Sequence, residues 1–162
     1  MISTRSDVNS YTIGISKSDR KIMKKFVKDH FKKGMTRADK VDYLLDYIHN
    51  ETNYIKTSAQ WSKIGGKSYI YDIFKLHLGQ CAQYNGALAM FLAYLGYDAR
   101  LVCGYRGYSP KNKWSHYWCE VKIDGVTYLM EAGNKKDGPW GFNCVLYYES
   151  DGKYIKNGKN CY

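Results

Sequence analysis

The chain has 162 residues, 44 % of them hydrophobic, and a formal charge of +10. This length suits a single domain over residues 1–162, because no linker rich in proline, glycine or serine divides the sequence. No stretch approaches the roughly 20 apolar residues of a transmembrane helix, and residues 1–15 lack the basic region and apolar run of a secretory signal. A secreted or cell-surface protein whose signal lies outside the given chain stays compatible with the sequence.

The basic character is the main departure from average composition, with 25 basic residues against 15 acidic ones. Such a charge can attract nucleic acid, an anionic cell-surface polymer or an acidic membrane. No recognised nucleic-acid-binding module accompanies it, so specific nucleic-acid binding is not expected. Most lysines fall in predicted helices and loops, as at Lys24, Lys25, Lys32 and Lys33, where a solvated surface explains them more simply.

Two amphipathic helices are predicted over residues 18–33 and 36–50, because apolar residues recur there at steps of three and four. Gly34 ends the first helix, and Thr36 with Asp39 resembles a capping box at the start of the second. Residues 51–70, in contrast, show no sustained period. They predict a long irregular connection of the kind that often carries binding groups.

A third helix is predicted to begin at Cys81, directly after Gly79-Gln80, and to stop at Gly96, where glycine suits a left-handed C-cap. It is apolar over a broad face, which predicts a central, buried helix. The sequence then changes to short runs rich in Val, Tyr, Trp and Ile, which predict strands over residues 99–105, 115–123, 126–132 and 144–149. Asp-Gly pairs at 124–125 and 151–152 predict hairpin turns. Helices followed by an antiparallel sheet indicate an α+β fold.

Cys81 is the first candidate for chemistry, because unpaired N–H groups and the dipole at a helix start favour a thiolate. A small buried residue is the ordinary alternative for a free cysteine. The other four cysteines form an even set that could make disulfides in an oxidising compartment, and none has the paired spacing of a zinc site: Cys103, Cys119, Cys144 and Cys161.

The hairpin register brings a histidine and an acid together. If Ile123 faces Val126 across the Asp-Gly turn, His116 lies opposite Gly133, and Glu131 is its diagonal neighbour on the same face. The glycine leaves space for a long carboxylate to reach the imidazole. Cys81, His116 and Glu131 are therefore expected to form a triad of nucleophile, base and orienting acid.

Two sequence blocks resemble the transglutaminase-like superfamily of papain-type cysteine enzymes. They run from Gly79-Gln80-Cys81 through Tyr84, Phe91 and Leu95-Gly96-Tyr97 to Gly104-Tyr105, and from His116-Tyr117-Trp118-Cys119-Glu120-Val121 to Tyr128-Leu129-Met130-Glu131. Together they cover residues 70–132. The resemblance implies a papain-like fold, with N-terminal helices and the nucleophile helix packed on an antiparallel sheet.

The resemblance also implies roles for single residues. The family's usual acid is aspartate, whereas this chain has Glu131 at the matching position, with Asn134 as a second-shell alternative. The backbone N–H of Cys81 is the natural first donor to an oxyanion. Tyr71 matches a tyrosine of bacterial relatives and is the expected second donor. Other aromatic candidates for that donor are Tyr69 and Trp61. The remaining histidines are expected to be surface, packing or connecting residues: His30, His49 and His77.

Three functions follow from the resemblance, all without a cofactor. The first is a cysteine protease, in which a thiolate attacks a peptide, isopeptide or glutamine side-chain amide and water resolves the thioester. The second is a cross-linking transglutaminase, in which an amine takes the place of water. The third is a non-catalytic binding module that keeps the fold. No acidic loop of EF-hand type is present, so no metal requirement is expected.

Overall fold

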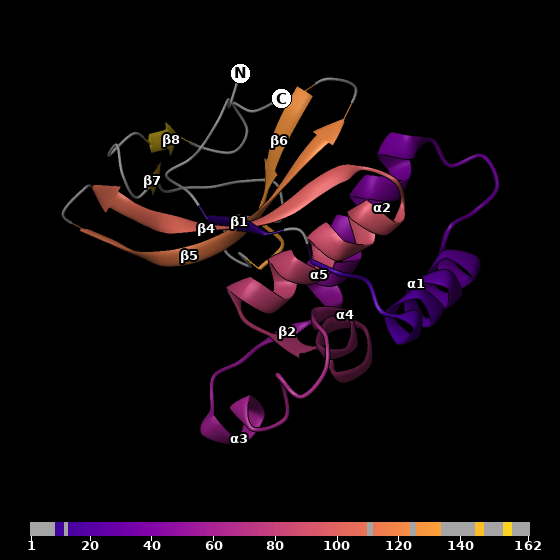
Figure 1. Cartoon of the computed structure of the whole chain (residues 1–162), viewed down its shortest axis with the longest axis horizontal. Helices are drawn as coiled ribbons and strands as arrows, with labels where there is room; N and C mark the ends of the chain where they lie inside the picture. The colour runs from indigo at the N-terminus through magenta and orange to yellow at the C-terminus, as the bar shows by residue number, and fades with distance from the viewer. Residues whose placement is uncertain are drawn as a thin grey trace.

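The computed structural model describes residues 9–11, 13–109, 112–123, 126–133, 145–147 and 154–156. Helices gather on one side of the molecule and the strands of the large sheet on the other, with helix α5 (Cys81–Tyr94) between them (Figure 1). This is the expected α+β arrangement of helices on an antiparallel sheet. In the described part of the chain, none of the helices has the length and apolar character needed to cross a membrane.

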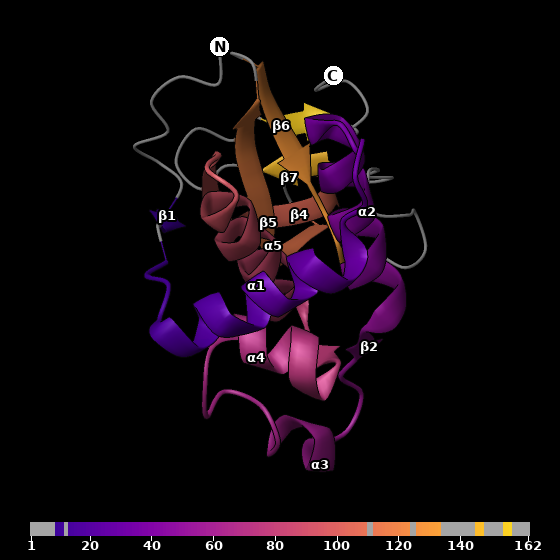
Figure 2. The same ribbon diagram turned by 90° about the vertical axis from the view of Figure 1, so that its right-hand side faces the viewer.

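The N-terminal helices are α1 (Lys17–His30) and α2 (Arg37–Glu51). Both begin with a capping box, in which a Ser or Thr hydroxyl accepts from an N–H three residues on and the Asp side chain there accepts in return. The predicted helices are confirmed, although α1 ends three residues earlier than expected. Figure 2 shows α1 and α2 on the same side of the molecule.

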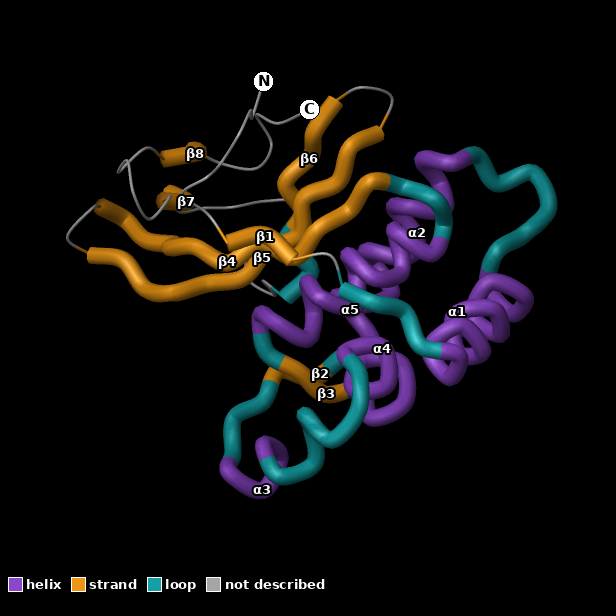
Figure 3. Tube along the Cα trace, in the orientation of Figure 1, coloured by secondary structure: helices purple, strands orange, loops and turns teal. Residues whose placement is uncertain are grey.

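The connection after α2 contains short elements that the sequence did not predict. They are β2 (Asn53–Tyr54), α3 (Ser58–Trp61), and α4 (Tyr69–Tyr71), which runs into the π-helix η1 (Asp72–Leu76). The expected long connection is therefore present, but it is not irregular throughout. Elements of five residues or fewer are too short to set up a hydrophobic period, which explains the miss. Figure 3 shows this region at the end of the molecule away from the large sheet.

Helix α5 is central, as expected, and all ten residues from Gln83 to Leu92 are buried. Gly96 follows its C-cap with a φ of 94°, a left-handed conformation that glycine adopts without strain. On the helical side, the Phe26 ring contacts those of Tyr47, Phe74 and Phe91, with centroids 4.8, 5.1 and 5.2 Å apart. These contacts bind α1, α2, η1 and α5 into one core.

The large sheet has the order β6-β5-β4-β7-β8, and β1 pairs with β4 beside that path. All its pairs are antiparallel, and the strands are β1 (Asn9–Tyr11), β4 (Asp98–Ser109), β5 (Asn112–Ile123), β6 (Val126–Met130), β7 (Val145–Tyr147) and β8 (Tyr154–Lys156). Ile123 pairs with Val126, so the predicted register of the first hairpin is confirmed. Both predicted Asp-Gly turns lie outside the described residues.

Candidate active site

Cys81 is the first residue of α5 and is partly buried. The chain before it is held by β3 (Leu78–Gly79), which runs parallel to β2. The N–H of Ile55 donates to the carbonyl of Gly79 at 3.0 Å. The position of the cysteine is therefore fixed by a short bridge that joins the end of the connection to the start of the central helix.

Gly79 allows this bridge to pass close to the helix. A Cβ at this position would lie 2.7 Å from the Cβ of Gln83 and 3.0 Å from Cδ1 of Ile73, which is too close for any other residue without movement of its neighbours. His77, at the C-cap of the π-helix, has a φ of 53°, in the left-handed region that non-glycine residues rarely occupy. The segment before Cys81 thus depends on close packing and local strain, both of which recur at functional sites.

The start of α5 is capped from within. The side chain of Gln83 accepts the backbone N–H of Gln80 at 3.0 Å, and the carbonyl of Gln80 accepts the first helical hydrogen bond, from Tyr84, at 3.0 Å. The N–H of Cys81 follows this cap in the first helical turn, where N–H groups have no partner within the helix. It is thus suited to meet a negatively charged oxygen.

His116 lies on β5 and is 8 % exposed, and its Nε2 is hydrogen-bonded to Oε2 of Glu131. The contact predicted from the hairpin register is confirmed. Burial disfavours the charged ring, but the negative charge of Glu131 and hydrogen bonds with Cys81 and Glu131 raise the pKa of His116 to about 9. The imidazole therefore connects the sulfur at the helix start with the buried acid.

Glu131 is fully buried and directly follows β6, whose ladder with β5 ends at Met130. Its second oxygen, Oε1, accepts from the Nδ2 of Asn85 at 2.9 Å and from the N–H of Gly133 at 2.8 Å. A Cβ on Gly133 would lie 3.2 Å from the same oxygen, so the glycine leaves room for the carboxylate, as expected. A buried carboxylate needs such donors to remain charged.

Asn85 is a site residue that the sequence analysis missed. It lies one helical turn after Cys81 and is fully buried. Its Nδ2 lies 3.0 Å from the carbonyl of Cys81 and 2.9 Å from the carbonyl of Tyr117, and its Oδ1 accepts from the N–H of Ala132 at 3.0 Å. A polar residue four positions after the nucleophile, at the start of a long apolar run on the same helix, was the available signal.

Other polar contacts support the same region. Nδ1 of His49 lies 3.0 Å from the carbonyl oxygen of Ala132, so this nitrogen carries the proton and donates. His49 is buried, which agrees with the packing role expected for it. Burial raises the pKa of Tyr84, whose hydroxyl donates to the carbonyl of Thr52 at 2.6 Å and so ties α5 to the end of α2.

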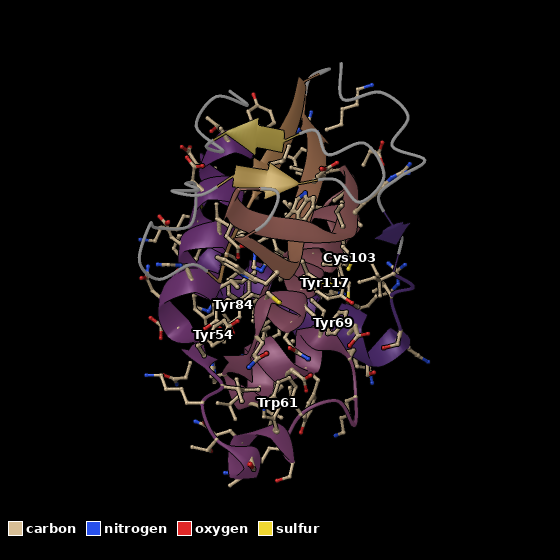
Figure 4. The ribbon with its side chains drawn as sticks, turned by 90° about the vertical axis from the view of Figure 1, so that its left-hand side faces the viewer. Tyr54, Trp61, Tyr69, Tyr84, Cys103 and Tyr117 are labelled. Carbon is tan, nitrogen blue, oxygen red and sulfur yellow. The ribbon has the colours of Figure 1, made fainter. Side chains whose placement is uncertain are left out.

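The three aromatic candidates for an oxyanion donor lie in different surroundings. Tyr71 ends α4 and is partly buried, with the ammonium of Lys67 3.9 Å from its ring centroid. Tyr69 packs so closely on Gly86 of α5 that a Cβ there would lie 2.3 Å from its ring. Trp61 is 48 % exposed on α3, and in the view of Figure 4 it lies below the other labelled side chains. Asn134, the alternative acid partner, lies outside the described residues.

The cysteines differ in environment. Cys103 is partly buried and Cys119 fully buried, and both are free thiols. Desolvation, with a smaller contribution from the charge of Glu131, raises the pKa of Cys119, which keeps that thiol protonated. Cys144 and Cys161 lie outside the described residues. Within those residues, no group of three or more His, Cys, Asp and Glu side chains is arranged to hold a metal ion.

Residues 24–131, more than half of the chain, match the family model of the transglutaminase-like superfamily. None of the curated proteins matches the chain significantly. Among solved structures, the periplasmic domain of TgpA from Pseudomonas aeruginosa aligns at 22 % identity with a TM-score of 0.53, over 75 % of this chain and 45 % of its own. A candidate cysteine protease from Cytophaga hutchinsonii aligns at 19 % identity with a TM-score of 0.58, over 90 % of this chain and 50 % of its own.

The arylamine N-acetyltransferase NAT3 from Bacillus cereus, described with a unique Cys-His-Glu catalytic triad, aligns at 15 % identity with a TM-score of 0.56. The alignment covers 88 % of this chain and 68 % of that one. The chain spans half or less of the length of the TgpA and Cytophaga structures. At these identities the structural likeness establishes the fold alone.

Proposed function

Because the chain belongs to the transglutaminase-like superfamily, which typically uses cysteine-based catalysis, we propose that Cys81 is the nucleophile of an acyl-transfer enzyme. In this proposal His116 is the base and Glu131 the acid that orients it. The observation that carries the proposal is the position of the His116 imidazole between the cysteine at the start of α5 and the buried carboxylate. The Cys-His-Glu triad described for the Bacillus cereus enzyme supports the use of glutamate within this fold.

The reaction begins with a thiolate at Cys81 and an imidazolium at His116. The sulfur attacks the carbonyl carbon of an amide, and the resulting oxyanion is stabilised by the N–H of Cys81 at the helix start. His116 then donates its proton to the nitrogen of the leaving amine, the C–N bond breaks, and a thioester remains. Water or a second amine attacks the thioester, His116 takes a proton from it, and the free cysteine is restored.

We assign the second oxyanion donor to Tyr71, from α4. The support is its phenol group, which is suited to hydrogen-bond a developing negative charge, and its place on the segment that packs against α5. The nearby ammonium of Lys67 adds a positive charge beside the ring. Of the two fates of the thioester we place hydrolysis first, which makes the protein a cysteine peptidase. A cross-linking transglutaminase is the alternative, and a binding module without catalysis is the third candidate.

Product identity tests the choice between these functions. We expect peptides incubated with the protein to be cleaved, or their glutamine side chains deamidated, even when a primary amine is present in excess. Mass spectrometry of peptides in water and in the presence of the amine measures both outcomes. Incorporation of the amine as the main product would favour the transglutaminase, and unchanged peptides in both reactions would favour the binding module.

A second property concerns the exposed face of α1. Six cations lie on this face, and the single exposed acid of the helix, Asp29, is paired with one of them, Lys25, at 2.5 Å. The six are Lys17, Arg20, Lys21, Lys24, Lys25 and Lys28. They form a stripe about 17 Å long from Lys17 to Lys28, given a rise of 1.5 Å per residue. The apolar face of the same helix is occupied by the core, so the stripe cannot insert into a lipid bilayer. We propose that it binds a linear phosphate-bearing polymer at a cell surface.

Charge reversal on the stripe tests this proposal. We expect Lys21→Glu, Lys24→Glu and Lys28→Glu together to weaken binding to long-chain inorganic polyphosphate at least about tenfold, and to reduce the salt dependence of binding by roughly two units in the slope. The matched control is Lys56→Glu, Lys63→Glu and Lys75→Glu, three exposed lysines elsewhere. Equal losses in both variants would mean that only net charge matters. Tighter binding to anionic vesicles or to duplex DNA than to polyphosphate would contradict a cell-surface phosphate polymer as the partner.

A further inference from the structure

One fully buried side chain contacts all three segments that carry the proposed triad. The Nδ2 of Asn85 faces the carbonyl of Cys81 on α5, the carbonyl of Tyr117 next to His116 on β5, and Oε1 of Glu131 after β6. These three distances lie between 2.9 and 3.0 Å. No single backbone contact could fix the helix start, the strand and the acid relative to one another in this way.

The direction of the amide is determined by its neighbours. Three oxygens that can only accept surround Nδ2, whereas Oδ1 receives the backbone N–H of Ala132 at 3.0 Å. Rotating the amide by half a turn would place oxygen against three acceptors and the NH₂ group against a donor. Only this orientation places donor against acceptor at all four contacts, with the two N–H hydrogens of Nδ2 shared among the three oxygens.

The contact matters most for the carboxylate. Oε1 of Glu131 accepts from Asn85 and from Gly133, whereas Oε2 is hydrogen-bonded to His116. A glutamate has one more rotatable bond than an aspartate and loses more side-chain entropy when it is fixed. It therefore needs additional contacts if its carboxylate is to remain against the imidazole.

The backbone beside the acid is held as well. The peptide groups of Ala132 are bound on both sides, since its N–H donates to Asn85 and its carbonyl accepts from His49 of α2. We propose, on the basis of the function assigned above, that Asn85 is a positioning residue. It holds Glu131 against His116 and couples that pair to the start of α5, with His49 holding the following peptide from α2.

Two replacements of Asn85 separate positioning from simple packing. In Asn85→Asp the new carboxyl can donate to Glu131 only while it holds a proton, because two facing carboxylates repel each other. The quantity compared is the rate of Cys81 alkylation by iodoacetamide in Asn85→Asp divided by the rate in the wild type. We expect this ratio to be at least about tenfold lower at pH 8 than at pH 5. Asn85→Leu removes the donor at every pH. It should therefore lower the alkylation rate of Cys81 roughly tenfold to hundredfold, by the same factor at each pH.

Asn50→Asp is the matched control, because it makes the same change at an exposed position of α2 and should leave the rate unchanged. Circular dichroism and thermal melting establish that each variant is folded. If Asn85→Leu does not fold, Asn85→Ala, which also removes the donor and has a smaller side chain, replaces it. In a Glu131→Gln background, Asn85→Asp should lose its pH-dependent effect, because the partner carboxylate is gone.

The outcomes distinguish this inference from the proposed function. Wild-type Cys81 that reacts no faster than Cys103 would overturn the proposed function itself. Fast wild-type alkylation with identical, pH-independent losses in Asn85→Asp and Asn85→Leu would leave that function standing and overturn the positioning role. So would an Asn85→Asp effect that persists unchanged in the Glu131→Gln background.

Discussion

Replacing Cys81 with alanine is expected to lower amide turnover by roughly a thousandfold or more while leaving the fold intact. The reason is that the reaction has no other nucleophile at the start of α5, and the side chain is only partly buried, so its loss opens little space in the core. The measurement is kcat/KM on a peptide substrate together with the melting temperature. Residual activity close to that of the wild type would show that Cys81 is not the nucleophile.

The free thiols of the same chain provide internal controls for the reactivity of Cys81. Iodoacetamide at neutral pH should modify Cys81 first, Cys103 slowly and the buried Cys119 hardly at all, as intact-mass analysis and peptide mapping can show. His116→Ala should slow the modification of Cys81 at least about tenfold at pH 7, since an unassisted thiol is mostly protonated there. Modification of Cys103, which pairs with Tyr117 on the neighbouring strand, should not change. Equal slowing at both cysteines would indicate general loss of structure.

The sequence predicted those parts of the site that depend on local geometry. A two-residue turn and the alternation of a strand were sufficient to bring His116 and Glu131 together, because every later pair follows from the first one at Ile123 and Val126. The start of α5 could also be predicted from the sequence, since Gly79-Gln80 interrupts the pattern before a long apolar run. Both features lie within about fifteen residues of the turn or break that defines them.

The contacts between distant segments could not be predicted in the same way. Asn85 reaches Glu131 across 46 positions of sequence, and His49 reaches Ala132 across 83. Neither pairing leaves a periodic signal, because it depends on how α2, α5 and the sheet pack. The π-helix before Cys81 was not predicted for a different reason. Its five residues, which end in a left-handed residue at His77, are stabilised by their surroundings rather than by their own propensities.

Replacing Glu131 with glutamine should lower the upper pH limit of activity. Desolvation lowers the pKa of His116, and in the wild type the charge of Glu131 and the hydrogen bonds with Cys81 and Glu131 overcome it and raise that pKa to about 9. Glutamine keeps the burial but removes the charge, so the pKa should fall to the ordinary value of about 6.5 or below. The active ion pair requires a protonated imidazole, which exists only below this pKa. At pH 8 the protonated fraction should therefore drop roughly thirtyfold.

The pH profile of kcat/KM and the NMR titration of the His116 ring measure this shift independently. Glu51→Gln, which removes an exposed acid from the end of α2, is the control and should leave both curves in place. Glu131→Asp keeps the charge but withdraws it by one methylene, so its alkaline limit should lie between those of the wild type and the glutamine variant. An alkaline limit that stays near pH 9 in Glu131→Gln would mean that another group holds the proton on His116, and the proposed triad would lose its acid.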